Sequence, residues 1–120
     1  MVSDNLLMAR FLIIEPHEDV RQLYAAVVRG LGHKAVFFDG DFTQEPQVIL
    51  VEPSDPDSFS AAHRLRHDYP GVAIVCASIH EPAYNDVAVL QPAVYLVKPF
   101  RLVELTDALQ LARSQNCPTL

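Results

Sequence analysis

The chain has 120 residues, half of them hydrophobic and a fifth charged, which is the size and composition of one globular domain with a buried core. Its formal net charge of −6 argues against nucleic acid or an anionic membrane surface as a direct partner. No apolar run reaches the roughly 20 residues of a membrane-spanning helix, and the first residues lack the basic start of a signal peptide. The two cysteines make no disulfide framework and favour a reducing cytoplasm.

The first predicted strand is the continuous apolar run Phe11-Leu12-Ile13-Ile14, typical of a strand that is covered on both faces. A helix is predicted after it, because hydrophobic residues recur at helical spacing: Val20, Leu23, Tyr24, Val27, Val28 and Leu31. Glu18 and Asp19 lie in its first turn, where carboxylates interact favourably with the helix dipole. Gly32 is placed to end the helix.

The connection after the second predicted strand, 35–38, is unusually short. Eight residues, 39–46, follow Phe38 before Gln47 and the third strand, whereas a parallel crossover normally takes a dozen or more. We therefore predict that the helix expected here is missing or reduced to a single turn. Phe42 would then fold back over the uncovered face of strand two; alternatively, a partner or a second copy of the chain covers it.

The remaining strands are predicted at 48–51, 72–77 and 94–97. A helix begins at Pro56, a weaker one follows over 82–90, and the last carries Leu102, Leu105, Leu109 and Ala112 on one face. This alternation predicts a flavodoxin-like, doubly wound α/β fold with a parallel sheet of order 2-1-3-4-5. The domain would span 10–115, between an N-terminal extension, 1–9, and a C-terminal tail, 116–120. The carboxyl ends of the strands would then meet at one edge, where a site is expected.

The most specific motif is an apolar strand that delivers Lys-Pro-Phe ahead of a helix, in the run Val94-Tyr95-Leu96-Val97-Lys98-Pro99-Phe100. This motif and the predicted order of strands and helices together resemble the receiver domain of response regulators, the phosphoaspartate switch of bacterial two-component signalling. Receiver domains place an acidic pair for Mg²⁺ after strand one and a phosphate-accepting aspartate after strand three. A hydroxyl residue follows strand four, and a lysine follows strand five.

The resemblance implies that the chemistry of this site is degenerate. The acidic pair aligns with Glu15 and Pro16, the phosphate acceptor with Glu52, and the hydroxyl residue with Cys76. Pro16 offers no metal ligand, and the longer side chain of Glu52 moves its carboxylate away from the position of a nucleophile. Cys76 lacks a strong hydroxyl donor and is expected to be a small buried hydrophobe. We therefore predict no metal, no catalytic residue and no phosphorylation of aspartate.

The lysine of the family is retained as Lys98, and the resemblance implies a cis peptide bond before Pro99. Glu52 is expected to pair with Lys98, and our hypothesis is that this pair locks the site. Alternatively, the carboxylate of Glu52 stands in for a phosphorylated acceptor, although one charge with two oxygens copies a phosphoryl group poorly. His17, which follows Pro16 at the mouth of the site, is the histidine of most interest.

The signalling face of receiver domains is built from helix four, strand five and helix five. The matching residues are Tyr84, Val87, Tyr95, Arg101 and Glu104. We predict an atypical receiver-like domain, not an enzyme and without cofactors, that acts through protein–protein contacts, a homodimer among them, independently of aspartyl phosphorylation. The alternative is a working response regulator that is phosphorylated on Glu52 or Asp55.

Overall fold

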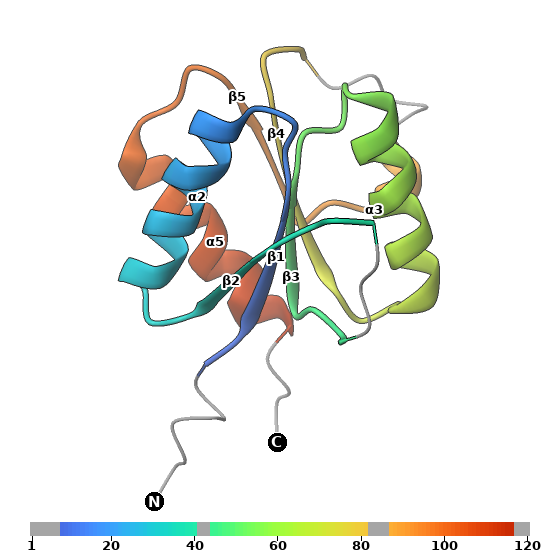
Figure 1. Ribbon diagram of the computed structural model, residues 1–120, viewed down its shortest axis with the longest axis horizontal. Coiled ribbons are helices and arrows are strands. Elements are labelled where there is room, and N and C mark those ends of the chain that lie inside the picture. Colours follow the sequence, from blue (N-terminus) through green and yellow to red (C-terminus); the bar gives the residue numbers. More distant parts are fainter. Residues whose placement is uncertain (1–7, 41–43, 82–86, 117–120) are drawn as a thin grey trace, which may run out of the picture.

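The computed structural model describes residues 8–40, 44–81 and 87–116. Five parallel strands form one sheet in the order β2-β1-β3-β4-β5, as predicted (Figure 1). The strands are β1 (Arg10–Ile14), β2 (Lys34–Phe37), β3 (Val48–Val51), β4 (Ala73–Ser78) and β5 (Val94–Val97). Helices α2 (Glu18–Gly30) and α5 (Leu102–Asn116) cover one face, and α3 (Pro56–Asp68) covers the other, beside the short 3-10 helix η1 (Ala88–Leu90). No helix within these described ranges is long and apolar enough to cross a membrane.

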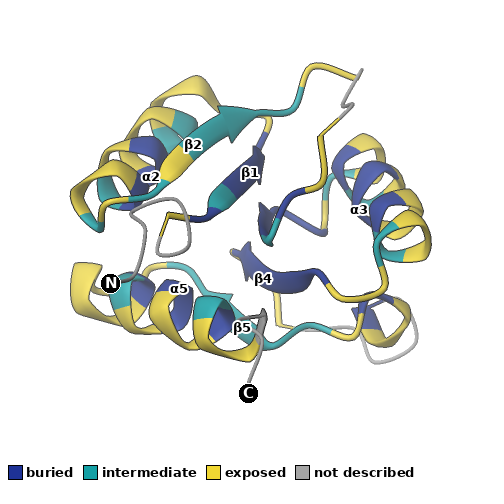
Figure 2. Ribbon diagram, turned by 90° about the horizontal axis from the view of Figure 1, so that it is seen from below, coloured by how far each residue is buried: buried dark blue, intermediate teal, exposed yellow. Residues whose placement is uncertain are grey.

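The hydrophobic core forms two layers, one on each side of the sheet. Phe11 and Ile13 of β1 belong to the cluster beneath α2 and α5, whereas Leu12 and Ile14 belong to the cluster beneath α3. Figure 2 shows the buried residues on the inner sides of the helices and the exposed residues on their outer sides. Because helices cover both faces of the central strands, their sequences are continuously apolar rather than alternating, which is why these strands could be predicted.

The helix α2 ends in a glycine turn. Gly32 has φ +87°, a backbone conformation that glycine adopts without strain. Its N–H donates to the carbonyl oxygen of Arg29 at 3.0 Å, and the N–H of His33 donates to that of Val28 at 3.2 Å. These two bonds satisfy carbonyl groups of the last turn, which would otherwise lack a partner. The prediction that Gly32 ends the helix is therefore confirmed.

Two leucines that helical periodicity assigned to buried faces are exposed instead. Leu23 of α2 is 52% exposed and Leu102 of α5 is 60% exposed, so both predictions were wrong. Ala25 is fully buried in α2, although it was not part of the predicted stripe. Both leucines line a groove between the two helices rather than the contact with the sheet.

The connection from β2 to β3 has no helix in its described parts, 38–40 and 44–47, as the short spacing predicted. Phe37 packs against the cluster beneath α2 and α5, while Val36 and Phe38 pack, half buried, against the cluster beneath α3. The two phenylalanines therefore point to opposite faces, as expected from strand geometry. Phe42, the predicted cover for this edge, lies outside the described residues.

Candidate functional site

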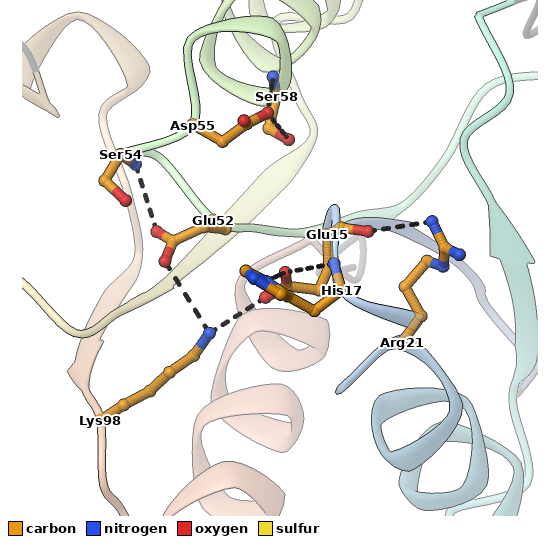
Figure 3. Close-up of polar contacts among 8 residues, drawn as sticks. All are labelled: Glu15, His17, Arg21, Glu52, Ser54, Asp55, Ser58 and Lys98. Atoms are coloured by element: carbon orange, nitrogen blue, oxygen red, sulfur yellow. Dashed lines mark hydrogen bonds and ion pairs between the residues drawn. The ribbon is translucent and has the colours of Figure 1, made fainter. Parts of the chain in front are cut away.

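Three charged side chains meet at the carboxyl edge of the sheet (Figure 3). Glu15 follows β1, Glu52 follows β3 and Lys98 follows β5. The ammonium Nζ of Lys98 donates to Oε1 of Glu15 at 3.0 Å and lies 3.8 Å from Oε1 of Glu52. Both acids are buried, with only 4% and 6% of their surfaces exposed. Two buried carboxylates thus share one cation, as expected for charges removed from water.

Lys98 pairs with Glu52, as we predicted, and it lies closer to Glu15, which we did not predict as its partner. The backbone N–H of Ser54 donates to Oε2 of Glu52 at 3.2 Å. This bond leaves the other carboxylate oxygen at a longer ion-pair distance from the ammonium. The contact between Glu52 and Lys98 exists, but it is the weaker of the two.

Glu15 is further bound by the residue at the start of α2. The backbone N–H of His17 donates to Oε2 of Glu15 at 3.0 Å, and the Nδ1 atom of its ring lies 3.1 Å from the same oxygen. Burial alone would raise the pKa of Glu15, but the hydrogen bonds from His17 and Lys98 outweigh it, so the pKa is lowered. Glu15 is therefore ionised at neutral pH.

Cys76 is fully buried in β4, as predicted. Burial, and secondarily the charge of Glu52, raise the pKa of its thiol to about 12. Because the thiolate is the reactive form, a thiol with so high a pKa is a poor nucleophile at neutral pH. Beyond it, Ser78 ends β4 with a fully buried hydroxyl that accepts the N–H of His80 at 3.1 Å. Ser78 was not singled out in the sequence, because it simply ends an apolar run.

Tyr24 lies beneath the site, a role that its place in a helical stripe did not indicate. It is 2% exposed, and its ring centroid is 6.0 Å from Nζ of Lys98. Its hydroxyl is buried and has no hydrogen-bond partner among the described residues. Burial and then the charges of Glu15 and Glu52 raise the pKa of Tyr24 far above its usual value, so the hydroxyl stays protonated.

We expect Tyr24→Phe to raise the free energy of unfolding by about 1 kcal/mol, because it removes a buried hydroxyl that gains no hydrogen bond on folding. Urea denaturation followed by circular dichroism measures the change. Tyr95→Phe is the matched control: the hydroxyl of Tyr95 donates to the carbonyl oxygen of His80 at 2.9 Å, so its removal brings no gain. A destabilised Tyr24→Phe variant would contradict the prediction.

The described residues do not fit Mg²⁺. Pro16 is exposed and offers no ligand, and Glu18 and Asp19 are exposed on α2. The ammonium of Lys98 already lies against Glu15, where its charge would oppose that of a dication. Across the described ranges, no three His, Cys, Asp or Glu side chains are grouped so that they could hold a metal ion.

Asp55, the other carboxylate considered as an acceptor, caps α3. Its Oδ2 accepts the backbone N–H of Ser58 at 2.9 Å and the hydroxyl of Ser58 at 2.8 Å. A side-chain oxygen at this position satisfies an N–H group that the first turn of a helix leaves without a partner. Asp55 therefore has a structural part in starting α3, directly after the turn that holds Glu52.

The residues assigned to a signalling face are only partly on the surface. Val87 is 8% exposed and packs in the core beneath α3, so its assignment to that face was wrong. Tyr95 is half buried, and Tyr84 lies outside the described residues. Arg101 and Glu104 are exposed and bind each other: the backbone N–H and Nε of Arg101 donate to Oε1 of Glu104 at 3.0 and 3.2 Å. This pair begins α5, next to the Lys98–Pro99 peptide bond, which is cis as the resemblance implied.

Neither a protein-family model nor a curated protein matches the sequence. The structure is similar to a CheY-like response regulator receiver domain protein from Methanospirillum hungatei, with TM-score 0.76, 12% identity, and 91% of this chain and 96% of that chain covered. It is also similar to a response regulator from Thermotoga maritima, with TM-score 0.71, 13% identity, and coverage of 89% and 98%. NtrX from Brucella abortus matches with TM-score 0.74, 17% identity, and coverage of 91% and 27%, so this chain spans about a quarter of that protein. The chain thus has the fold of response regulator receiver domains.

Proposed function

We propose that this chain is a receiver-like signalling domain that acts in the cytoplasm through protein–protein contacts and without phosphorylation of its site. It would have no enzymatic activity of its own. The receiver fold supports a role in signalling. The altered residues at the carboxyl edge of the sheet support independence from phosphate.

One arrangement of charges supports independence from phosphorylation most directly. In this site a protein ammonium, Nζ of Lys98, neutralises the buried carboxylate of Glu15 at 3.0 Å and lies 3.8 Å from that of Glu52. Phosphorylation of Glu52 would replace its single charge with the larger charge of a phosphoryl group, beside the buried carboxylate of Glu15 and a single cation. Because Pro16 offers no carboxylate, a metal ion that could compensate that charge would have one side-chain ligand fewer than the acidic pair of receiver domains supplies.

Glu52 and Asp55, the two carboxylates considered as phosphate acceptors, both accept hydrogen bonds from backbone N–H groups. Glu52 accepts a hydrogen bond from the N–H of Ser54, and Asp55 caps α3 through Ser58. A nucleophile has to lie in line with the phosphoryl group within a few tenths of an ångström, so a carboxylate fixed by such bonds is a poor acceptor. Both observations favour an interaction module over a phosphorylated switch.

We expect the intact mass of the protein to stay unchanged after incubation with acetyl phosphate and Mg²⁺, under conditions in which a receiver domain with its aspartate gains one phosphoryl group. Mass spectrometry of the undigested protein makes this measurement. A phosphoryl group on the wild type that Glu52→Ala abolishes would overturn the proposal and establish a response regulator with a glutamate acceptor. Loss with Asp55→Ala instead would place the acceptor at the start of α3.

A further inference from the structure

An apolar groove of about 400 Å³ is lined by residues of α2 and α5. These two helices lie on the same face of the sheet (Figure 1). Leu23, Val27 and Gly30 line it from α2, and Leu102 and Thr106 line it from α5. Among all its lining residues, only Thr106 has a polar side chain. Exposed leucines beside an apolar groove are typical of a surface that binds another protein.

The exposed side of α2 has a large residue at one end and a glycine at the other. Leu23, Ala26 and Gly30 lie at positions i, i+3 and i+7, so they share one side of the helix. Leu23 projects at one end. At the other end, apart from the neighbouring residues and backbone of its own helix, no atom lies within 4 Å of the point where a Cβ of Gly30 would stand.

The midpoint of this stripe lies between Ala26 and Val27, about 5 Å along the helix from both ends. A two-fold axis through that midpoint would bring Leu23 of one copy over Gly30 of another. The exposed side of α2 is therefore self-complementary, as an isologous interface requires.

The charges of α2 have a definite polarity. Glu18 and Asp19 lie in its first turn, where Arg21 pairs with Glu18 at 3.5 Å, and Arg29 lies in its last turn. An antiparallel pair of copies would place the acidic end of each against the basic end of the other, whereas a parallel pair would bring like charges together.

We infer that the face formed by α2 and α5 is a self-association surface, on which a second copy of this chain docks with its α2 antiparallel and with Leu23 of each copy over Gly30 of the other. It involves α2, which the signalling face implied by the receiver resemblance does not include. This inference rests on the proposed function to the extent that a module acting through protein contacts needs such a surface. It names the partner as the chain itself.

Sedimentation equilibrium of the full chain, from micromolar to near-millimolar concentration, tests the surface. The wild type is expected to dimerise with rising concentration. Leu23→Ala and Gly30→Gln are each expected to raise the dissociation constant about tenfold or more, which corresponds to the loss of one well-packed leucine contact. Gly30→Gln is the sharper variant, because glutamine has a higher helix propensity than glycine and its Cβ would have no close contact beyond its chain neighbours and the backbone of its own helix. Its folding stability should be equal to or above that of the wild type while its dimer weakens.

Leu111→Ala is the matched control, since Leu111 is 49% exposed on α5 but does not line the groove. Its dissociation constant should equal that of the wild type. A chain that is monomeric at every concentration would overturn the inference of self-association. A helix of another protein would then be the expected occupant of the groove. A dimer that neither Leu23→Ala nor Gly30→Gln weakens would also overturn it. Both outcomes leave phosphorylation independence standing, because that proposal depends on Glu52 and its surroundings.

Discussion

Replacing Lys98 with alanine is expected to lower the free energy of unfolding by about 3 kcal/mol at neutral pH, the size of effect seen when one partner of a buried ion pair is removed. The side chain of Glu15 is fully buried, and Nζ of Lys98 is its nearest cation at 3.0 Å. The side chain of Lys98 is 19% exposed, so the effect belongs to the lower part of the known range. Urea denaturation at pH 7 measures it.

The effect of Lys98→Ala should depend on pH in a definite direction. The pKa of Glu15 is lowered in the folded protein relative to its ordinary value of 4.5, so the unfolded chain binds the proton more readily. The stability that the ionised carboxylate contributes is therefore present above pH 4.5 and is lost as the pH falls through the folded pKa. Without the ammonium, the pKa of Glu15 is expected to be higher than in the wild type, because the hydrogen bond and the charge of Lys98 no longer lower it. The difference in stability between the variant and the wild type is therefore largest at neutral pH and shrinks as the pH falls.

A second substitution identifies which acid depends on the lysine. Glu15→Gln in the Lys98→Ala background should recover more of the lost stability than Glu52→Gln, because the distance from Nζ to Glu15 is the shorter. Lys34→Ala, at an exposed lysine of β2, is the control and should change stability little. If Lys98→Ala unfolds at the same urea concentration as the wild type, the ion pair does not stabilise the site.

The strands could be predicted because their surroundings leave a simple signature. Strands covered on both faces need apolar side chains at every position, and the runs 48–51 and 94–97 match β3 and β5 residue for residue. The strand order then follows from the family resemblance and from the rule that parallel crossovers are short and right-handed. The short connection after β2 was also readable, since eight residues cannot hold a full crossover helix.

The details of the faces could not be predicted in the same way. Helical periodicity gives the angle of a side chain around the axis but not what lies opposite, so Leu23 and Leu102 were assigned to the core although they face the groove between α2 and α5. Val87 was assigned to a surface on family resemblance alone, and its apolar side chain is buried instead.

The geometry of the site was predictable only to the level of which residues meet. The ends of β1, β3 and β5 bring Glu15, Glu52 and Lys98 together, as parallel strands require. Which carboxylate lies closer to Nζ of Lys98 depends on local geometry, such as the turn in which the N–H of Ser54 donates to Glu52. The spacing of residues in the sequence does not predict this turn.

Arg66 of α3 is the second position where we expect a large effect. Its guanidinium donates to four backbone carbonyl oxygens: from Nε to Leu90 at 2.9 Å, from Nη1 to Pro70 at 3.0 Å and Val72 at 2.7 Å, and from Nη2 to Gln91 at 3.3 Å. These carbonyl groups lie in the two loops that lead into β4 and β5. Gln91 has φ +49°, a left-handed backbone conformation that residues other than glycine rarely adopt. The hydrogen bonds from Arg66 therefore help to hold this loop in its conformation.

Arg66→Ala is expected to lower the free energy of unfolding by about 2 kcal/mol, because it leaves partly buried carbonyl groups without donors. Arg66→Lys should recover less than half of this loss, since one ammonium cannot reach groups that the planar guanidinium spans. Arg64→Ala, at an exposed position of the same helix, should change stability little.

Hydrogen exchange localises the effect of Arg66→Ala. The N–H of Ala93 donates to the carbonyl oxygen of Ile74 at 2.7 Å, so it reports how firmly the start of β5 is held beside β4. Its exchange should accelerate in Arg66→Ala more than that of Phe38, whose N–H donates to Ile13 at the far side of the sheet. Equal acceleration at both amides would mean that Arg66 stabilises the domain as a whole. An Arg66→Lys variant as stable as the wild type would mean that its charge matters and its shape does not.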